Sequence, residues 1–308
     1  QETPDSLAQK KYVNVTPLTP GMFGYSLLRS TYSHEFFSQI FDTLSAFHIP
    51  IEGLHTETGP GVFEAAILSS GALEAADRGV LFKTSVKELA YSHNIIASFM
   101  AKWNQHLPGC SGHLHQSLWD AKCEKNLFYD EHDAHKMSDI FKHYLAGQLY
   151  CLPELLPFYA PTVNSYKRLV EGHWAPTKAT WGFDNRTVAF RVILGSSKST
   201  RVETRVSGSD INSYLGIAAS LASGLYGIIN KIPLTSSAVE GSGYAAKDGI
   251  KLSKNLYEAT MKLQDSIIAK ELFGSDFIEH FVSTRLWEWR QFQSAVTDWE
   301  RERYFEII

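Results

Sequence analysis

The chain has 308 residues, of which 44% are apolar and 20% charged, and its formal net charge is −4 at pH 7. This composition predicts a globular protein with one large domain or two ordinary ones, and the acidic balance argues against a general nucleic-acid-binding protein. Three cysteines without a CxxC spacing favour a reducing, cytoplasmic location over a disulfide-bonded scaffold. The N-terminus lacks the apolar core of a signal peptide, and the most apolar stretch is too short to predict a membrane span.

A hairpin is the first element with chemical content. Apolar residues at helical spacing predict helices over 33–48, with Ser33 as N-cap, and over 72–93. Between them, two short strands flank a Gly-Pro-Gly turn, with Glu57 before the turn and Glu64 after it. Taken alone, these acids are ordinary polar residues beside a turn. A hairpin would nevertheless bring them to one point, where they could hold a cation.

Two strands are predicted next, a buried one at 95–100 (IIASFM) and one at 111–119 (SGHLHQSLW). Residues two apart on a strand share a face, so His113 and His115 would point into the same space. Neutral imidazoles suit metal coordination or hydrogen bonds to phosphate oxygens. A pair of structural or surface histidines is the plainer interpretation of this motif by itself.

Helices are expected over 135–159, where prolines should interrupt them, and a shaped loop over 164–177 (NSYKRLVEGHWAPT) carries Lys167 and Arg168. Strand signals at 179–193 and 200–207 precede a buried helix at 213–230, and the chain is helical from about residue 250. The absence of a regular βαβ rhythm favours an α+β fold with an antiparallel sheet flanked by helices. The expected C-terminal packing anchors are Trp287, Trp289, Phe292 and Trp299.

The strand RVETR at 201–205 places Arg201, Glu203 and Arg205 on one face and buries Val202 on the other. Such a stripe is either a solvated ion-pair ladder or an anion site with a metal-binding carboxylate between two guanidinium groups.

Further cations lie close by in the sequence, at Arg186, Arg191 and Lys198. Cations, carboxylates and histidines together are what a metal–nucleotide phosphoryl-transfer site requires. Because no Walker loop or GxGxxG motif occurs, strands would have to hold the phosphates.

The motifs ETGPGVFE, SGHLHQSL, NSYKRLV, DNRT and RVETR, in this order, resemble the catalytic domain of the glutamine synthetase family. The likeness runs from about residue 50 to 230 and continues more weakly to the end. It implies a catalytic domain over 1–308 with a curved antiparallel sheet flanked by helices. It also implies that an N-terminal β-grasp domain and an acidic strand, neither of them in this chain, precede residue 1, and that subunits assemble into stacked rings, such as a dodecamer.

The resemblance also implies roles for individual residues. The implied metal ligands are Glu57, Glu64, His113 and Glu203. The positions implied around ATP and its phosphates are Glu52, His115, Ser117, Arg191, Lys198 and Arg201. The positions implied around the glutamate substrate are Gly109, His113, Arg168 and Arg205, with Arg186 and Arg168 catalytic.

The implied reaction has two steps and belongs to nitrogen metabolism. With Mg²⁺ or Mn²⁺ as cofactor, ATP phosphorylates the γ-carboxylate of glutamate, and an amine then displaces phosphate from the γ-glutamyl phosphate. Family members usually read PGYEAP after NSYKRLV, and that glutamate handles ammonium. This chain reads EGHWAP, with Trp174 at the glutamate's position, and it has Pro108 where the family has an asparagine.

The WAPT–WG–DNRT pattern resembles the branch of γ-glutamylpolyamine synthetases, fungal developmental regulators and lengsin. We therefore expect an ATP-dependent ligase that uses an amine other than ammonia. Two alternatives stay open: an inactive, lengsin-like structural assembly and a true glutamine synthetase. Without the acidic strand, the chain by itself is expected to bind metal weakly, and inactivity of the isolated chain is one expectation. The segment KNLYEA resembles an adenylylation site, which would make Tyr257 the modified residue.

Overall fold

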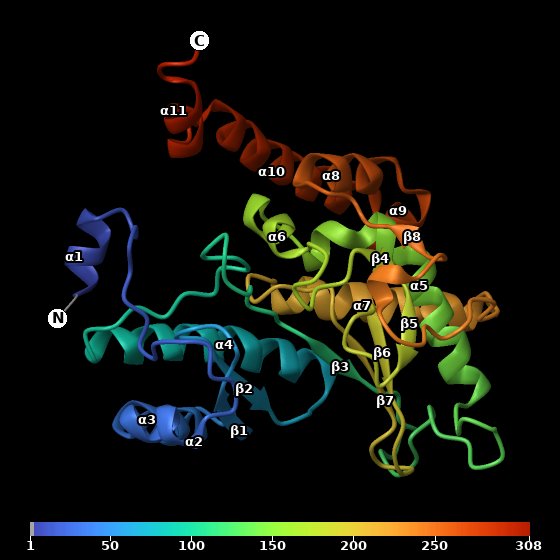
Figure 1. Cartoon of the computed structure of the whole chain (residues 1–308). Coiled ribbons are helices and arrows are strands. Elements are labelled where there is room, and N and C mark those ends of the chain that lie inside the picture. Colours follow the sequence, from blue (N-terminus) through green and yellow to red (C-terminus); the bar gives the residue numbers. More distant parts are fainter. Residues whose placement is uncertain (1–2) are drawn as a thin grey trace.

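A computed structural model describes residues 3–308. Figure 1 shows two groups of elements that meet in the middle of the molecule. The first group contains a two-stranded hairpin and the helices around it. Its elements are α1 (Pro4–Gln9), α2 (Leu27–Tyr32), α3 (His34–Ala46), β1 (Ile51–Thr56), β2 (Phe63–Ile67) and α4 (Ala72–Ser92). Apolar side chains of α3, including Phe37 and Leu44, form a small core with the hairpin and α4. The predicted hairpin is confirmed, and Ser33 stands at the N-cap of α3, although its side chain makes no capping hydrogen bond.

A four-stranded sheet forms the centre of the second group, in the order β3–β7–β6–β5. Its strands are β5 (Trp181–Phe183), β6 (Phe190–Ile193), β7 (Arg201–Thr204) and β3 (Leu114–Gln116). The β3–β7 and β6–β7 pairs are antiparallel, whereas β5 and β6 are parallel. The predicted α+β fold with an antiparallel sheet flanked by helices is confirmed, and only the β5–β6 pair at one edge differs from it by being parallel. A small separate pair joins β4 (Lys178–Ala179) to β8 (Ile250–Lys251).

The other elements of the second group are helices, most of which pack on this sheet and complete the main core, whereas α11 contributes no buried residue. They are α5 (Asp139–Tyr159), α6 (Val163–Arg168), α7 (Ser213–Ile229), the 3₁₀ turn η1 (Gly243–Ala245), α8 (Leu256–Asp265), α9 (Ile267–Phe273), α10 (Ser275–Ser294) and α11 (Asp298–Tyr304). Val192 and Val202, both fully buried, pack in the same core as the aromatic residues of α5. The helices α5 and α7 pack so closely that a Cβ on Gly227 would lie 2.1 Å from the carbonyl oxygen of His143. The predicted buried helix at 213–230 is thereby confirmed.

Three local expectations are wrong. Residues 95–100 form no strand, and Ile96 and Met100 are exposed. The helix α5 continues through Pro153 and Pro157. In the C-terminal helices, Trp287 and Trp299 are 58% and 61% exposed, so they do not anchor the core of this chain.

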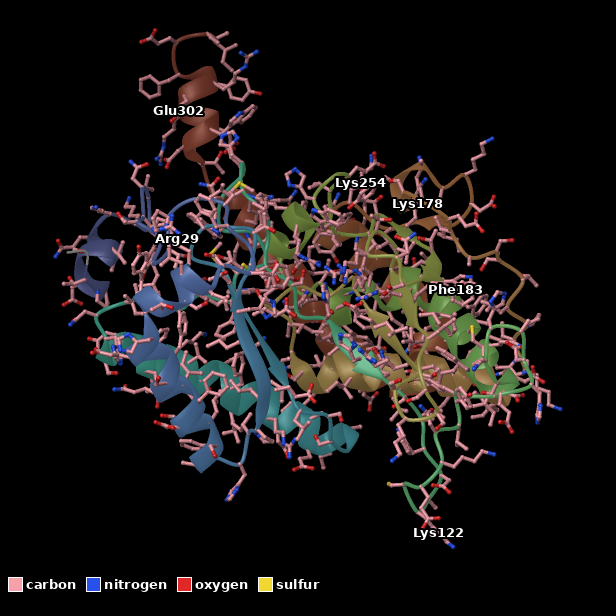
Figure 2. The ribbon with its side chains drawn as sticks, turned by 60° about the horizontal axis from the view of Figure 1, so that its bottom comes forward. Arg29, Lys122, Lys178, Phe183, Lys254 and Glu302 are labelled. Carbon is pink, nitrogen blue, oxygen red and sulfur yellow. The ribbon has the colours of Figure 1, made fainter. Side chains whose placement is uncertain are left out.

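Side-chain views place the C-terminus apart from the rest of the molecule. In Figure 2, Glu302 of α11 stands beyond the body of the chain, and Lys122, in the loop between β3 and α5, projects at the opposite end. Among residues 3–308, no helix combines the length and the apolar content that a membrane crossing requires.

Candidate active site

Three side chains converge on the β1–β2 hairpin because of its strand register. His55 pairs directly with Glu64 across the two strands, and Glu57 follows His55 by two residues. Cross-strand partners and residues two apart share a face, so all three side chains point the same way. His55 Nε2 lies 3.1 Å from Glu57 Oε1 and 3.8 Å from Glu64 Oε2. One ligand atom from each of the three side chains lies within 4.8 Å of the others, a spacing that suits a metal ion.

The hairpin site concentrates negative charge. Burial raises the pKa of Glu64, and the neighbouring carboxylate of Glu57 raises it further. A bound cation would relieve this repulsion, so the donor set fits a divalent metal. Sequence reasoning found the two acids but missed His55, although its position two residues before Glu57 on a strand was a usable signal.

An aromatic ring fixes His55 in place. Tyr25 stacks on the imidazole, with 4.8 Å between ring centroids and 15° between ring planes. The segment that carries Tyr25 is itself held on β1, because Tyr25 N donates to Thr56 O at 2.7 Å and Ser26 N donates to Thr56 Oγ1 at 2.9 Å.

A second charged cluster surrounds Glu203 on β7. His113 Nδ1 lies 3.0 Å from Glu203 Oε1, and the Arg205 guanidinium donates to the same oxygen at 2.5 Å. Arg191 donates to Glu203 Oε2 at 3.0 Å, and its remaining nitrogens bind Asp184. The stripe predicted from RVETR is therefore a buried network, in which Glu203 is 2% exposed.

The charge states of this cluster follow from burial and pairing. Burial alone would raise the pKa of Glu203, but the hydrogen bond from His113 and the charge of Arg205 outweigh burial and lower it well below its usual range. Burial lowers the pKa of His113 to about 4, against the opposing effect of Glu203, so the imidazole is neutral at pH 7.

A neutral His113 that donates from Nδ1 has a lone pair on Nε2. That atom is buried and has no hydrogen-bond partner among the described residues. A metal ion is the kind of partner that such a nitrogen accepts, and a carboxylate on the other ring nitrogen is the usual support for a metal-binding histidine. His113 thus also fits a metal.

The two clusters interact weakly through their charges. Glu203 is near enough to the hairpin to contribute to the raised pKa of Glu64. Beside them, Arg201 Nε donates to His115 Nδ1 at 3.1 Å, and Ser117 Oγ accepts a hydrogen bond from Trp119 at 2.9 Å.

Arg168 lies behind this network and is 2% exposed. Its guanidinium donates to the carbonyl oxygens of Val206 and Arg205 at 3.0 and 3.1 Å, and to Ser111 Oγ at 2.7 Å. Burial and the nearby Arg205 charge lower the pKa of Arg168 to about 10, so it stays cationic at neutral pH. Gly109 packs on its side chain, because a Cβ there would lie 3.0 Å from Arg168 Cγ.

Three predicted residues stay apart from these contacts. Glu52, Arg186 and Lys198 are exposed, and their charged groups make no hydrogen bond or ion pair within residues 3–308. Arg186 still lies close to the cluster, because its backbone oxygen accepts a hydrogen bond from Arg205 Nε at 3.1 Å.

The loop that carries Trp174 borders on a tyrosine that sequence reasoning missed. Trp174 is 61% exposed and has φ of 57°, in the left-handed region. The backbone amides of Trp174 and Ala175 flank the hydroxyl of Tyr244 and oppose the rise that burial causes in its pKa. The hydroxyl is buried but completes no hydrogen bond within the described chain.

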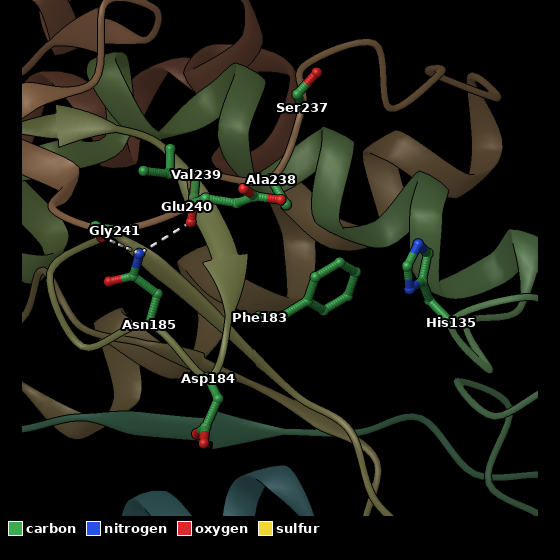
Figure 3. A pocket seen from close by; sticks show the side chains of 9 residues that line it. All are labelled: His135, Phe183, Asp184, Asn185, Ser237, Ala238, Val239, Glu240 and Gly241. Carbon is green, nitrogen blue, oxygen red and sulfur yellow. Dashed lines mark hydrogen bonds between the residues drawn. The ribbon is translucent and has the colours of Figure 1, made fainter.

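The backbone around Tyr244 is held firmly. Asn185 donates to the carbonyl oxygens of Val239 and Gly241, as Figure 3 shows, and Gly243 N donates to Thr187 Oγ1 at 2.6 Å. No local sequence pattern predicts that Tyr244 lies near Trp174, which is 70 residues away in the sequence.

A pocket of about 610 Å³ lies beside the charged site. Figure 3 shows the Phe183 ring pointing toward His135, with segment 237–241 on another side of the pocket and the Asp184 side chain directed away from that segment. Among the predicted site residues none lines this pocket; it touches the charged cluster only through Asp184, the partner of Arg191.

Comparison with known protein families gives a match over most of the chain. Residues 5–304 match the family described as glutamine synthetase, catalytic domain.

Three curated relatives carry the same match. A protein of Dictyostelium discoideum named type-1 glutamine synthetase 2 is 56% identical over 100% of this chain and 59% of its own length. A glutamate–isopropylamine ligase of a Pseudomonas species is 36% identical, covering 98% of this chain and 66% of its own. A gamma-glutamylethanolamide synthetase of Streptomyces coelicolor is 37% identical, covering 96% and 62%. The chain thus spans about three fifths of the length of these relatives.

Solved structures agree with the fold. The GmaS/ADP complex superposes with a TM-score of 0.85 at 28% identity, over 95% of this chain and 68% of that one. GmaS without ligand gives a TM-score of 0.83.

Proposed function

Because this chain belongs to the glutamine synthetase family, we propose that it is the catalytic part of an ATP-dependent ligase that joins the γ-carboxylate of glutamate to an amine other than ammonia. The proposal treats residues 1–308 as one catalytic domain. The observation that carries it is the set of two charged clusters, the hairpin group of His55, Glu57 and Glu64 and the Glu203 network with its arginines, which supplies the carboxylates, imidazoles and guanidinium groups that the reaction needs.

Metal ions would occupy two positions in this proposal. Glu57 and Glu64 would hold one. His113 and Glu203 would hold the other, for which Glu203 would exchange one of its present contacts with His113, Arg191 and Arg205 for the ion. The metals, Mg²⁺ or Mn²⁺, would supply positive charge that offsets the charge of the ATP phosphates.

The arginines act on the transferring phosphoryl group and on glutamate. The γ-carboxylate oxygen of glutamate attacks the γ-phosphorus of ATP, the bond to the β-phosphate oxygen breaks, and ADP and γ-glutamyl phosphate form. Arg186 has a guanidinium without a protein partner in the described chain, so it is free to contact the transferring group. Arg168 and Arg205 supply the cationic field that orients glutamate.

Nucleotide binding would use the opposite side of the network. His115 is exposed in the middle of β3, and Arg201 at the start of β7 donates to it. We assign both to the phosphates, together with Arg191 of β6, whose side chain is 16% exposed. Ser117 extends the same edge, and we assign Glu52 and Lys198, whose charged groups are exposed, to the surroundings of the nucleotide.

The second step determines which amine is used. The amine nitrogen attacks the carbonyl carbon, phosphate leaves, and the nitrogen loses a proton. Trp174 stands where a proton-accepting glutamate is expected, and an indole cannot take that proton. Its exposed ring is suited to cover an alkyl substituent on the amine. Two relatives support a substituted amine, one named as a ligase of glutamate and isopropylamine and the other as a synthetase of gamma-glutamylethanolamide.

Ammonia as substrate is the second candidate. The relative with 56% identity is named a glutamine synthetase, and this observation favours ammonium-dependent activity. The two candidates differ only in the amine, so one assay separates them.

We also propose that the intact protein assembles with itself and works in the cytoplasm. Large apolar side chains lie open to solvent at both ends of the chain, including Leu27 at 85% and Phe305 at 85%. Subunit contacts are what usually cover such residues. Native mass spectrometry of the intact protein measures the assembly directly.

The test is phosphate release by the intact protein with ATP, Mg²⁺ or Mn²⁺, glutamate and a panel of ammonium, ethylamine, isopropylamine, ethanolamine and putrescine. Release should depend on a substituted amine, and mass spectrometry should find the matching γ-glutamylamide. Arg186→Ala should lose release by at least about 100-fold, whereas Arg301→Ala, in the exposed helix α11, should retain it. Release that no amine stimulates would overturn the ligase proposal, and fastest release with ammonium would overturn its choice of amine.

A further inference from the structure

We propose that His55 is a direct ligand of the divalent cation held by Glu57 and Glu64, so that the hairpin site has one nitrogen and two carboxylate ligands. The inference rests on the proposed function only in placing a divalent cation on the hairpin. It adds a ligand, and with it a metal preference, that the two acids alone do not give.

Strand geometry places the imidazole where a ligand must stand. His55 and Glu64 are register partners, and Glu57 follows on the same face. Nε2 lies 3.1 Å from Glu57 Oε1 and 3.8 Å from Glu64 Oε2. An ion with ligand distances of about 2.1–2.3 Å separates neighbouring ligand atoms by about 3 Å. Small side-chain movements would therefore bring all three atoms onto one ion.

The ring is prepared for this role before an ion arrives. Stacking on Tyr25 fixes the plane of the imidazole, and backbone hydrogen bonds from Tyr25 and Ser26 to Thr56 fix Tyr25 relative to β1. Metal-binding histidines are usually oriented by a hydrogen bond on the second ring nitrogen, whereas for His55 the described chain supplies stacking on Tyr25. The side chains of His55, Glu57 and Glu64 are 32%, 28% and 51% exposed, so an ion can enter from solvent.

A nitrogen ligand changes which metal the site prefers. Mg²⁺ binds oxygen ligands almost exclusively and keeps several waters. Imidazole ligands favour transition-metal ions over Mg²⁺. Among these ions, the affinity for a site with nitrogen and oxygen ligands rises from Mn²⁺ to Co²⁺ along the first-row series. The hairpin should therefore bind Mn²⁺ more tightly than Mg²⁺, and Co²⁺ more tightly than Mn²⁺.

The competing role for His55 is a simple hydrogen-bond donor that holds Glu57. Glutamine separates the two roles, because its amide nitrogen can occupy the position of Nε2 and donate to Glu57 but cannot give a nitrogen lone pair to a metal. His55→Gln therefore keeps the hydrogen bond that positions Glu57 and removes the nitrogen ligand of the metal. The matched control is His132→Gln, because His132 is 88% exposed and pairs only with Glu131 in the described chain.

The experiment titrates the full 308-residue chain with Mn²⁺ alone and follows free Mn²⁺ by electron paramagnetic resonance. At one equivalent, pulsed measurements detect ¹⁴N coupling from a bound imidazole. A His113→Gln variant removes the coupling that the second metal position would contribute. Circular dichroism melting of each variant verifies that it is folded.

We expect His55→Gln to weaken Mn²⁺ binding by at least about tenfold, to abolish the ¹⁴N coupling in the His113→Gln background, and to reduce the preference for Mn²⁺ over Mg²⁺. His132→Gln should change none of these. Unchanged affinity and retained ¹⁴N coupling in His55→Gln would overturn the inference. Binding without turnover leaves it standing, since that outcome counts against the ligase proposal alone.

Discussion

His113 donates its Nδ1 hydrogen to Glu203 Oε1 across 3.0 Å, while its Nε2 stays buried without a partner. The carboxylate at one end of this imidazole is therefore saturated by protein groups, and the nitrogen at the other end is open. Glu203 also accepts hydrogen bonds from Arg191 and Arg205, so one acid pairs with two cations and orients one histidine. This arrangement makes Glu203 important for folding as well as for the proposed metal position.

Replacing Glu203 with alanine should strongly destabilise the chain. The substitution leaves the buried Arg205 guanidinium without its carboxylate, and breaking a buried pair from one side costs about 3–5 kcal/mol. Urea denaturation of the metal-free chain measures the free energy of unfolding. Asp184→Ala is the matched control, because Asp184 binds the same Arg191 from a side chain that is 76% exposed, and it should cost under about 1 kcal/mol. Equal losses in the two variants would contradict this account.

Replacing Tyr244 with phenylalanine should leave stability unchanged or raise it by up to about 1 kcal/mol. The hydroxyl is buried and unpaired, so its removal leaves no partner unsatisfied. Thermal melting and urea denaturation provide the measurement. Tyr144→Phe is the control, because the Tyr144 hydroxyl donates to Gln116 Oε1 at 2.7 Å and its loss should cost about 1 kcal/mol. If Tyr244→Phe instead lowers the free energy of unfolding as much as Tyr144→Phe does, the Tyr244 hydroxyl makes a hydrogen bond to the Trp174 loop in solution.

The hairpin was predictable because its geometry is local. The Gly-Pro-Gly turn and the alternating residues on either side fix two short strands, and the strand period then brings Glu57 and Glu64 together. His55 is harder to predict, because a histidine on a strand is an ordinary residue without its neighbours, although the same period puts it on the face of the two acids.

Features that depend on tertiary packing were not predictable. Pro153 and Pro157 indicate helix ends, yet the core around α5 holds the helix together across both. The apolar sequence of residues 95–100 is typical of a buried strand, but no strand pairs with this segment in the described chain. Tyr244 reaches Trp174 only through the fold.

Acid should weaken a loop contact at Asp133. Its carboxylate accepts hydrogen bonds from Lys142 Nζ at 2.7 Å and from the backbone amide of His135 at 2.9 Å, and these bonds lower its pKa to about 2. Because the folded pKa lies below the ordinary value of 3.8, the stabilisation is present above that value and is lost as the pH falls toward 2.

Asp133→Asn should therefore reduce stability most at pH 6, and the difference from the wild type should shrink as the pH falls from 3.8 toward 2. Denaturation curves across this range measure the difference. Asp139→Asn should show a smaller difference at pH 6, since Asp139 is 87% exposed and contacts Lys142 at 3.3 Å. A difference that stays constant with pH would exclude the Asp133 carboxylate as its cause.

Replacing Trp174 with glutamate should move the amine preference toward ammonium. The substitution supplies a carboxylate where the structure has an exposed indole, beside the loop that Tyr244 borders. A positioned base contributes about 100-fold or more to a proton transfer, so the ratio of kcat/KM for ammonium to that for the best substituted amine should rise by at least about tenfold. Trp174→Phe retains an apolar ring without a proton acceptor, and it should keep the original ranking of amines. If both variants keep that ranking, position 174 does not face the amine, and the preference must come from another part of the site.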